Sequence, residues 1–212
     1  MSEHISARQF RESEGVEDWR VLGEGACAHF RTASGAKLVA AIADLDGVAL
    51  DLRHDGVTVR LITIEDGYYG LSASAVDLAR RISAAARELG IPADPSAVQT
   101  VQVTIDALDI ANVLPFWRAV LAYVDRGDGP EDIVDPRGRG PAIWFQQMDA
   151  PRPQRNRVHF DVWVPHHLAE ERIAAALAAG GRLVSDKEAP GFWVLADPES
   201  NEVCVATPLT RD

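Results

Sequence analysis

Cysteine is scarce in this 212-residue sequence, and basic residues are outnumbered by acidic ones. The two cysteines, Cys27 and Cys204, are far apart in the chain, which excludes a small disulfide-built scaffold and predicts reduced thiols. Lys and Arg number 21 against 32 Asp and Glu, so the net charge is −11, and no basic run is present. A nucleic-acid-binding protein usually has a basic face. We therefore expect no nucleic-acid partner.

Long apolar runs are also absent. No apolar stretch approaches the ~20 residues of a membrane-spanning helix, so no membrane partner is expected. The first four residues, MSEH, lack the basic and apolar regions of a signal peptide, which predicts a cytoplasmic location. Apolar residues make up 47% and charged residues 25%, as in ordinary globular proteins. At roughly 100–200 residues per domain, the chain holds one or two domains.

A linker is predicted where two prolines and a glycine follow a strong helical pattern, in Gly90-Ile-Pro-Ala-Asp-Pro95. It divides the chain into domains 1–95 and 96–212. In the first domain, Ser6 and Gln9 form a capping-box pattern, and helices are expected over 35–45 and 72–89. An alternating β-branched strand is expected over 57–63. Helix, strands, helix, strand and helix in this order predict an α+β domain.

The second domain repeats one pattern twice, with a strand, a helix and further strands in about 55 residues per copy. The first copy has strands over 101–106 and 142–148 and a helix over 109–123, which Pro115 should kink or delay. The second copy has strands over 157–164, 192–195 and 202–206 and a helix over 166–179. This duplication predicts two related modules.

Three strings occur in order in this half: residues 102–109 leading into 116–121, then Asn156-Arg-Val-His-Phe-Asp-Val162, then Asp197-Pro-Glu-Ser-Asn-Glu202. With them, residues 98–208 resemble the vicinal-oxygen-chelate superfamily, which includes glyoxalase I, bleomycin-resistance proteins and extradiol dioxygenases. The 156–161 string resembles its glyoxalase-like subgroup, and Ser200 replaces glycine of the family's DPxGN turn. The resemblance implies two βαβββ modules that curve into a cup.

A divalent metal is usually held in this superfamily by one residue on each of the first, fourth, fifth and eighth strands. The resemblance places Gln102, Gln146, Arg157 and Cys204 at these positions. Arginine stays protonated and has no acceptor, so it cannot be a ligand. A zinc set with His159 in place of Arg157 remains open, because both residues share a strand face. The cofactor is unknown, and a divalent metal is not favoured.

The competing interpretation is a metal-free pocket whose walls are aromatic and whose few polar groups converge. Strand alternation places His159 and Asp161 on one face, where His159, oriented by Asp106 or Asp161, would act as general base. These two are the candidate catalytic residues. The candidate ligand-binding residues are Gln102, Thr104, Asp106, Trp144, Gln146, Arg157 and Cys204. A structural hydrogen-bonding role for His159 and a buried apolar role for Cys204 remain alternatives.

The first half resembles pterin-4a-carbinolamine dehydratases over residues 5–90. The resemblance rests on Trp19, on residues 51–61, and on Gly70-Leu-Ser72 followed by residues 77–82. The family's His-His-Pro motif falls on Asp46-Gly-Val48, and its Thr-His-Asp motif falls on Thr63-Ile-Glu65. Dehydration needs a proton donor and a base, and neither glycine nor isoleucine transfers a proton. The resemblance therefore implies a dehydratase-like fold without dehydratase catalysis.

Three functions follow from these two resemblances, and they leave open whether the protein is an enzyme. The first is a small-molecule-binding protein of the glyoxalase and bleomycin-resistance type, without the usual metal site, whose first half is an accessory module. The second is a lyase, isomerase or dioxygenase that uses His159 as base or metal ligand. The third is residual 4a-hydroxytetrahydrobiopterin dehydratase, with Glu65 or His54 as substitute groups. Both families commonly form oligomers, so a homodimer is also open.

Overall fold

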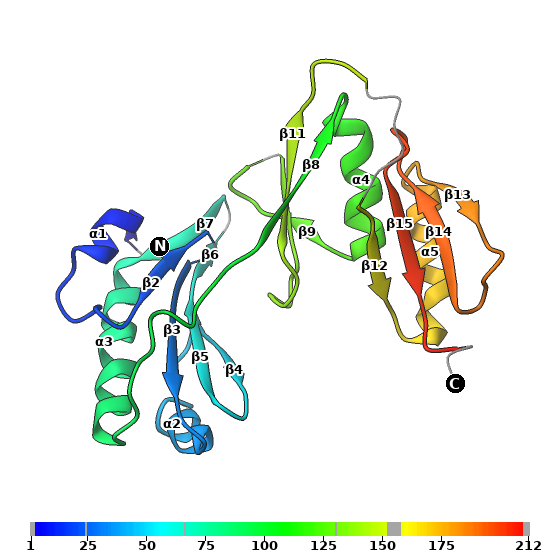
Figure 1. The fold of residues 1–212 in the computed structure, drawn as a ribbon. Helices are drawn as coiled ribbons and strands as arrows, with labels where there is room; N and C mark the ends of the chain where they lie inside the picture. Colours follow the sequence, from blue (N-terminus) through cyan, green and yellow to red (C-terminus); the bar gives the residue numbers. More distant parts are fainter. Residues whose placement is uncertain (1–2, 24, 66, 130, 152–157, 210–212) are drawn as a thin grey trace. The chain divides into compact units, whose positions relative to one another are not determined.

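The computed structural model describes residues 3–23, 25–65, 67–129, 131–151 and 158–209 (Figure 1). The chain divides into two compact units, Met1–Thr100 and Val101–Asp212. Both mix helices with sheets, as the sequence predicts. Within the described residues, no helix is both long and apolar enough to cross a membrane.

The first unit contains two antiparallel sheets, one of four strands in the order β2-β3-β5-β4 and one of three in the order β1-β7-β6. Its elements are β1 (His4–Ile5), α1 (Ala7–Arg11), β2 (Arg20–Leu22), β3 (Gly25–Arg31), α2 (Gly35–Ala41), β4 (Val48–Leu52), β5 (Gly56–Leu61), β6 (Thr63–Glu65), β7 (Tyr68–Ser72) and α3 (Ala73–Glu88). The capping box predicted at Ser6 and Gln9 is present at the start of α1.

Two sequence expectations for this unit need correction. Four strands, not one, lie between the second and third helices, because the 57–63 run is divided between two hairpins. The segment expected as a linker is bound to the unit: the Arg31 N–H donates to the Pro92 carbonyl and the Asp94 N–H to the His29 carbonyl. It can pair there because β2 covers only the Gly25–Cys27 part of that edge of β3.

The second unit contains two βαβββ modules in succession, as the resemblance of this half implies; the strands at 124–125, 132–134 and 182–185 are not expected from the sequence pattern. The first has β8 (Gln102–Ala107), α4 (Ile110–Leu121), β9 (Val124–Asp125), β10 (Asp132–Val134) and β11 (Ala142–Gln147). The second has β12 (Phe160–Trp163), the 3-10 turn η1 (His166–Leu168), α5 (Ala169–Ala178), β13 (Arg182–Ser185), β14 (Phe192–Ala196) and β15 (Glu202–Ala206). Helix α4 begins at Ile110, so Pro115 lies inside it and does not delay it.

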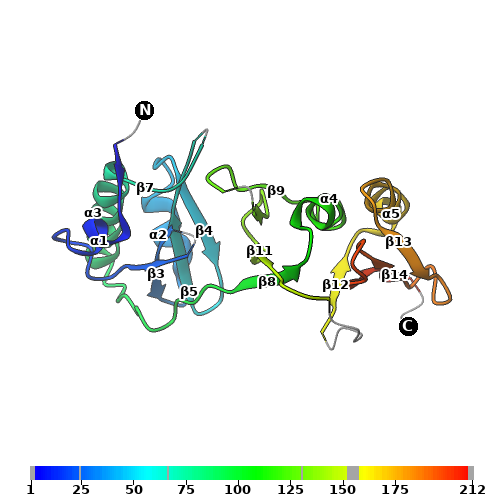
Figure 2. The ribbon, with the colours of Figure 1, turned by 90° about the horizontal axis from the view of Figure 1, so that it is seen from above.

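Both modules have the same topology. Their sheets have the strand orders β8-β11-β10-β9 and β12-β15-β14-β13, and in each the first strand runs parallel to the last. Helices α4 and α5 pack side by side (Figure 2). A single apolar core joins the modules and includes Trp117 from α4, Phe145 from β11 and Leu195 from β14. The sheet faces that point away from this core are therefore the places where polar chemistry can be displayed.

Candidate functional site

Strands β12 and β15 position the candidate site of the second module. They pair in parallel with Asp161 beside Cys204 and Trp163 beside Ala206. Alternate residues of β12, Phe160 and Val162, pack against the core. Because side chains of a strand alternate between faces, Asp161 and Trp163 point to the other side of the sheet. Trp163 is 49% exposed there, so this side of the sheet presents an aromatic ring to solvent.

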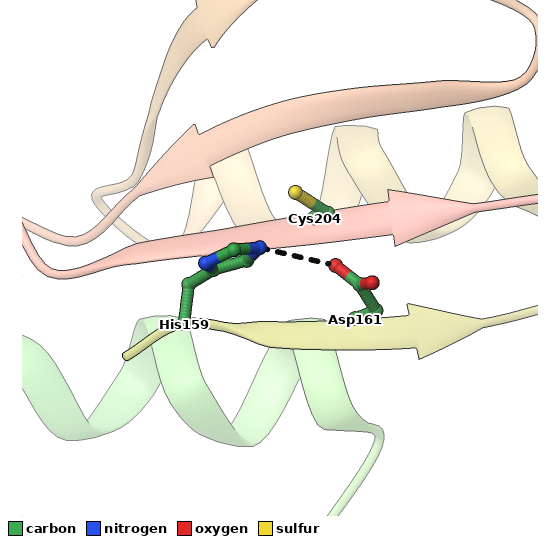
Figure 3. A group of neighbouring side chains, drawn as sticks. All are labelled: His159, Asp161 and Cys204. Carbon is green, nitrogen blue, oxygen red and sulfur yellow. Dashed lines mark ion pairs between the residues drawn. The ribbon is translucent and has the colours of Figure 1, made fainter. Parts of the chain in front are cut away.

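His159, Asp161 and Cys204 form one cluster on this side (Figure 3). His159 Nε2 lies 3.5 Å from Asp161 Oδ1, and about half of each side chain is exposed. One imidazole nitrogen, one carboxylate oxygen and the Cys204 sulfur all lie within 4.8 Å of one another. Cys204 itself is a buried thiol. The cluster therefore combines two solvent-accessible ionisable groups with one held rigidly in the sheet.

The remaining predicted residues form a second group, on the first module. Strands β8 and β11 pair in parallel with Thr104 beside Trp144 and Asp106 beside Gln146, so each pair shares a face. Gln102 begins β8 and is exposed. This face carries neutral amides and a hydroxyl around one carboxylate. Arg157 lies outside the described residues, so its role stays a prediction.

The sequence places Asp197 in the DPxGN-like turn but gives no indication of its buried contacts. Its carboxylate is fully buried and accepts hydrogen bonds from Trp117 Nε1 at 2.9 Å and from the backbone N–H groups of Glu199 and Asn201 at 2.9 and 2.8 Å. The Glu199 carboxylate accepts the backbone N–H groups of Leu108 and Asp109, at the start of α4. The turn thus joins the second module to the helix of the first. The signal was the Asp-Pro pair that directly follows an apolar strand.

A cavity of about 200 Å³ lies in the first unit, where the dehydratase resemblance places both altered motifs. The two motif positions contribute Asp46, Gly47 and Thr63 to its lining. Thr63 Oγ1 and Ser72 Oγ are 2.8 Å apart, as are Ser72 Oγ and Ser74 Oγ. Among the described residues that line it, Asp46 is the one ionisable group. The cavity can form hydrogen bonds, but hydroxyl groups are poor acids and bases near pH 7.

The folded architecture of residues 102–206 defines a two-module α+β domain, and comparison with known families agrees. The family model "Glyoxalase-like domain" matches residues 102–206. Residues 102–206 therefore match a glyoxalase-like domain, which supports the glyoxalase-like part of the resemblance stated for this half. No curated protein matches the chain significantly.

Solved structures similar to this chain include the hypothetical protein SA1046 from S. aureus, with 13% identity, 52% of this chain and 94% of that chain covered, and a TM-score of 0.40. The fosfomycin resistance protein FosX from Mesorhizobium loti has 8% identity, coverage of 51% and 90%, and a TM-score of 0.41. A glyoxalase/bleomycin resistance protein/dioxygenase family enzyme from Burkholderia phytofirmans PsJN has 18% identity, coverage of 51% and 97%, and a TM-score of 0.39. At these values the likeness says nothing about what this chain binds.

Proposed function

We propose that the glyoxalase-like domain binds a small molecule on the open face of the β12-β15-β14-β13 sheet. The observation that carries the proposal is the convergence of His159, Asp161 and Cys204 beside the exposed Trp163 on one sheet face. Small-molecule sites combine an apolar, often aromatic wall with a few polar groups that fix the orientation of the ligand. This face supplies both.

The groups on this face favour a ligand with a planar apolar part and an oxygen-bearing polar end. The Trp163 ring offers a flat surface for stacking. The imidazole of His159 can donate or accept a hydrogen bond, and Asp161 Oδ1, 3.5 Å from His159 Nε2, orients the ring. Arg157, predicted on the same face, would add a cation for a carboxylate or enolate.

A second candidate function is acid–base catalysis by the same domain, as a lyase or isomerase. The proximity of His159 Nε2 to Asp161 Oδ1 favours it, because a carboxylate that orients an imidazole is a common way to build a general base. In this scheme His159 takes a proton from a bound ligand and returns it to another atom. Dioxygenase chemistry would in addition require a metal.

The first unit is proposed to be a dehydratase-like accessory module that binds without catalysing. Its cavity holds three hydroxyl groups and Asp46, whereas dehydration requires an acid and a base at opposite ends of the substrate. Residual dehydratase activity is the alternative. A cytoplasmic location and a homodimer complete the proposal.

Ligand binding can be tested with benzoate, pyruvate and indole, which separate the carboxylate from the planar apolar part. Saturation-transfer NMR and thermal shift of the full chain would detect binding. We expect benzoate, which combines both parts, to bind best, and Trp163→Ala to weaken it about tenfold, a ~1.4 kcal/mol loss typical of stacking. Leu177→Ala removes an exposed apolar side chain from α5 and serves as the control. Equal losses in both variants, or no binding of any probe, would contradict the proposal.

A further inference from the structure

The cavity of the first unit combines an apolar wall with a few polar groups. Its volume is about 200 Å³. Sites for drug-sized molecules measure roughly 300–1,000 Å³, so a ligand of this cavity is smaller than a typical drug molecule. The apolar lining includes Leu61, Ile62 and Leu78, and the polar lining includes Thr63, Ser72, Ser74 and Asp46.

The hydroxyl groups of the lining are joined by hydrogen bonds into what we call the hydroxyl chain. Thr63 Oγ1 and Ser72 Oγ are 2.8 Å apart, and so are Ser72 Oγ and Ser74 Oγ. Each hydroxyl has one O–H and two lone pairs. The two bonds use two O–H groups and two lone pairs, so one O–H and four lone pairs are left. The hydroxyl chain can therefore donate one hydrogen bond to a ligand and accept several.

Asp46 adds a carboxylate to the same cavity. It lies two residues before β4 and is exposed. Among the described residues, none forms a hydrogen bond or an ion pair with this carboxylate. By contrast, Oδ2 of the nearby Asp44 lies 3.9 Å from Arg81 Nη2. Because an ionised carboxylate only accepts hydrogen bonds, Asp46 needs a donor from a ligand, and a positively charged donor binds it most strongly.

Electrostatics separate the place for a cation from the place for a neutral oxygen. Helix α3 begins at Ala73, directly after Ser72, and Ser74 and Ala75 of its first turn line the cavity. The N-terminus of a helix carries partial positive charge, which disfavours a cation there and favours an oxygen lone pair. The positive charge of a ligand therefore belongs at Asp46, and a neutral polar group belongs at the hydroxyl chain.

The polar groups and the apolar wall together select a class of ligand. A hydroxyl group both donates and accepts, so it matches the hydroxyl chain better than a carboxylate, which only accepts. An ammonium group is a donor with positive charge, so it matches Asp46. The apolar wall requires a hydrocarbon part between or beside these two groups.

We propose that the cavity of the first unit binds a small aliphatic amino alcohol, with its ammonium group at Asp46, its hydroxyl group at the hydroxyl chain and its hydrocarbon part against Leu61 and Leu78. No covalent bond forms or breaks. The proposal rests on the proposed role of this unit, binding without catalysis, and names the class of its ligand. It uses no residue of the glyoxalase-like domain. The ligand also differs in chemistry from the pterin that the dehydratase resemblance implies.

Valinol and three analogues test this assignment by titration calorimetry of the full-length protein. Isoamyl alcohol lacks the ammonium group, isoamylamine lacks the hydroxyl group, and free valine has a carboxylate in place of the hydroxyl group. We expect valinol to bind most tightly. Asp46→Asn should weaken valinol binding at least about tenfold, because a charged partner is lost, and should leave isoamyl alcohol binding unchanged. Thr63→Val keeps the shape of the side chain and should weaken valinol binding about fivefold, with isoamylamine binding unchanged.

Three further variants make the test specific. Asp44→Asn makes the same change of charge outside the cavity lining and should alter valinol binding by less than about twofold, because exposed charges are screened. Trp163→Ala, in the glyoxalase-like domain, should leave valinol binding unchanged. Because Ser74 is exposed, Ser74→Ala removes a hydroxyl of the chain without disturbing the core, and it should weaken valinol binding as Thr63→Val does.

The outcomes separate this assignment from the proposed role of the unit. Isoamyl alcohol or valine that binds as tightly as valinol, and that Thr63→Val weakens, would overturn the amino-alcohol assignment while the unit keeps its binding role. Equal losses of valinol binding in Asp46→Asn and Asp44→Asn would also overturn the assignment, because net charge rather than Asp46 would then attract the ligand. If none of the four compounds binds, both the assignment and the proposed binding role of the unit are wrong.

Discussion

The two modules of the glyoxalase-like domain share one topology but carry different chemistry on their open faces. The first displays Gln102, Thr104 and Gln146, which do not ionise, around Asp106. The second displays His159 and Asp161 beside Cys204. Their helices differ in how much apolar volume they bury. Helix α4 buries two aromatic residues, whereas α5 buries only Ala169 and Ala176 among its described positions. The first module thus supplies most of the bulk of the core, and the second supplies the reactive groups.

The modules also share a turn between their last two strands. In the first module the turn is Asp135-Pro-Arg-Gly138, and in the second it is Asp197-Pro-Glu-Ser200. In both, the backbone N–H of the fourth residue donates to the carbonyl of the first, at 2.8 and 3.0 Å. In each turn, the carboxylate of the leading aspartate accepts a hydrogen bond from the backbone N–H two residues later, at 2.9 Å in both turns. The difference is that the Asp197 carboxylate also accepts a hydrogen bond from Trp117 Nε1, which belongs to the first module.

Removing this hydrogen bond between the two modules should have the largest effect on stability. Asp197→Ala removes the acceptor of the buried Trp117 N–H and of the turn's N–H groups, and buried donors without partners cost ~1–3 kcal/mol each. We expect the free energy of unfolding to fall by about 3 kcal/mol, measured by urea denaturation followed by circular dichroism. Asp186→Ala, at an exposed turn position, is the control. A loss no larger than in this control would mean that Asp197 does not join the modules.

The packing between the two helices provides the next test. A Cβ atom at Gly181, just after α5, would lie 2.3 Å from the ring of Phe116 in α4 and 2.9 Å from the Ala176 carbonyl. Gly181→Ala should therefore destabilise the domain by about 1–3 kcal/mol, as overpacking does in a dense core. Gly129→Ala, where a Cβ atom meets only one atom near the limit of contact, should change stability by less than about 0.5 kcal/mol. Equal urea-denaturation midpoints for Gly181→Ala and Gly129→Ala would show that the two helices move apart at little cost in free energy.

Some features of this domain could be predicted from the sequence, and others could not. Alternation placed His159 and Asp161 on one strand face, since a period of two requires no knowledge of neighbouring strands. The position of Cys204 beside them depends on the parallel register of β12 with β15, which brings together residues 43 positions apart and has no local signal. Asp197 was assigned to a polar turn because composition describes a turn but not the buried Trp117 N–H that faces it. Comparing the two Asp-Pro turns in the sequence would have revealed their equivalence.

The first module's turn predicts a pH dependence. Burial raises the pKa of Asp135, but hydrogen bonds from the backbone N–H groups of Arg137, Gly140 and Arg139 lower it by more. The net pKa therefore lies below the ordinary 3.8. A depressed pKa means that the ionised carboxylate stabilises the fold above about pH 4 and that this contribution is lost as the pH falls through the lowered value. Asp135→Asn should reduce stability by about 1 kcal/mol at pH 7 and by less at pH 3.

Urea denaturation at both pH values measures this difference. Asp186→Asn, an exposed aspartate in the second module, is the control for the general loss of negative charge. A stability difference between Asp135→Asn and the unmodified chain that stays constant from pH 7 to pH 3 would show that the three N–H donors do not favour the ionised carboxylate.

The smallest expected effect on stability concerns the fourth position of the two turns, where one has glycine and the other has serine in a left-handed backbone conformation. Gly138 and Ser200 both have left-handed φ angles, 64° and 75°, which glycine adopts freely and serine does not. Ser200→Gly should stabilise the protein by about 0.5 kcal/mol, because the ~1 kcal/mol relief of backbone strain exceeds the loss of an exposed hydrogen bond from Arg182 Nη2. Gly138→Ser should be destabilising by about 1 kcal/mol. Urea midpoints that move in opposite directions for the two substitutions would establish that the turns are equivalent, whereas a destabilising Ser200→Gly would show that the Arg182 contact outweighs the strain.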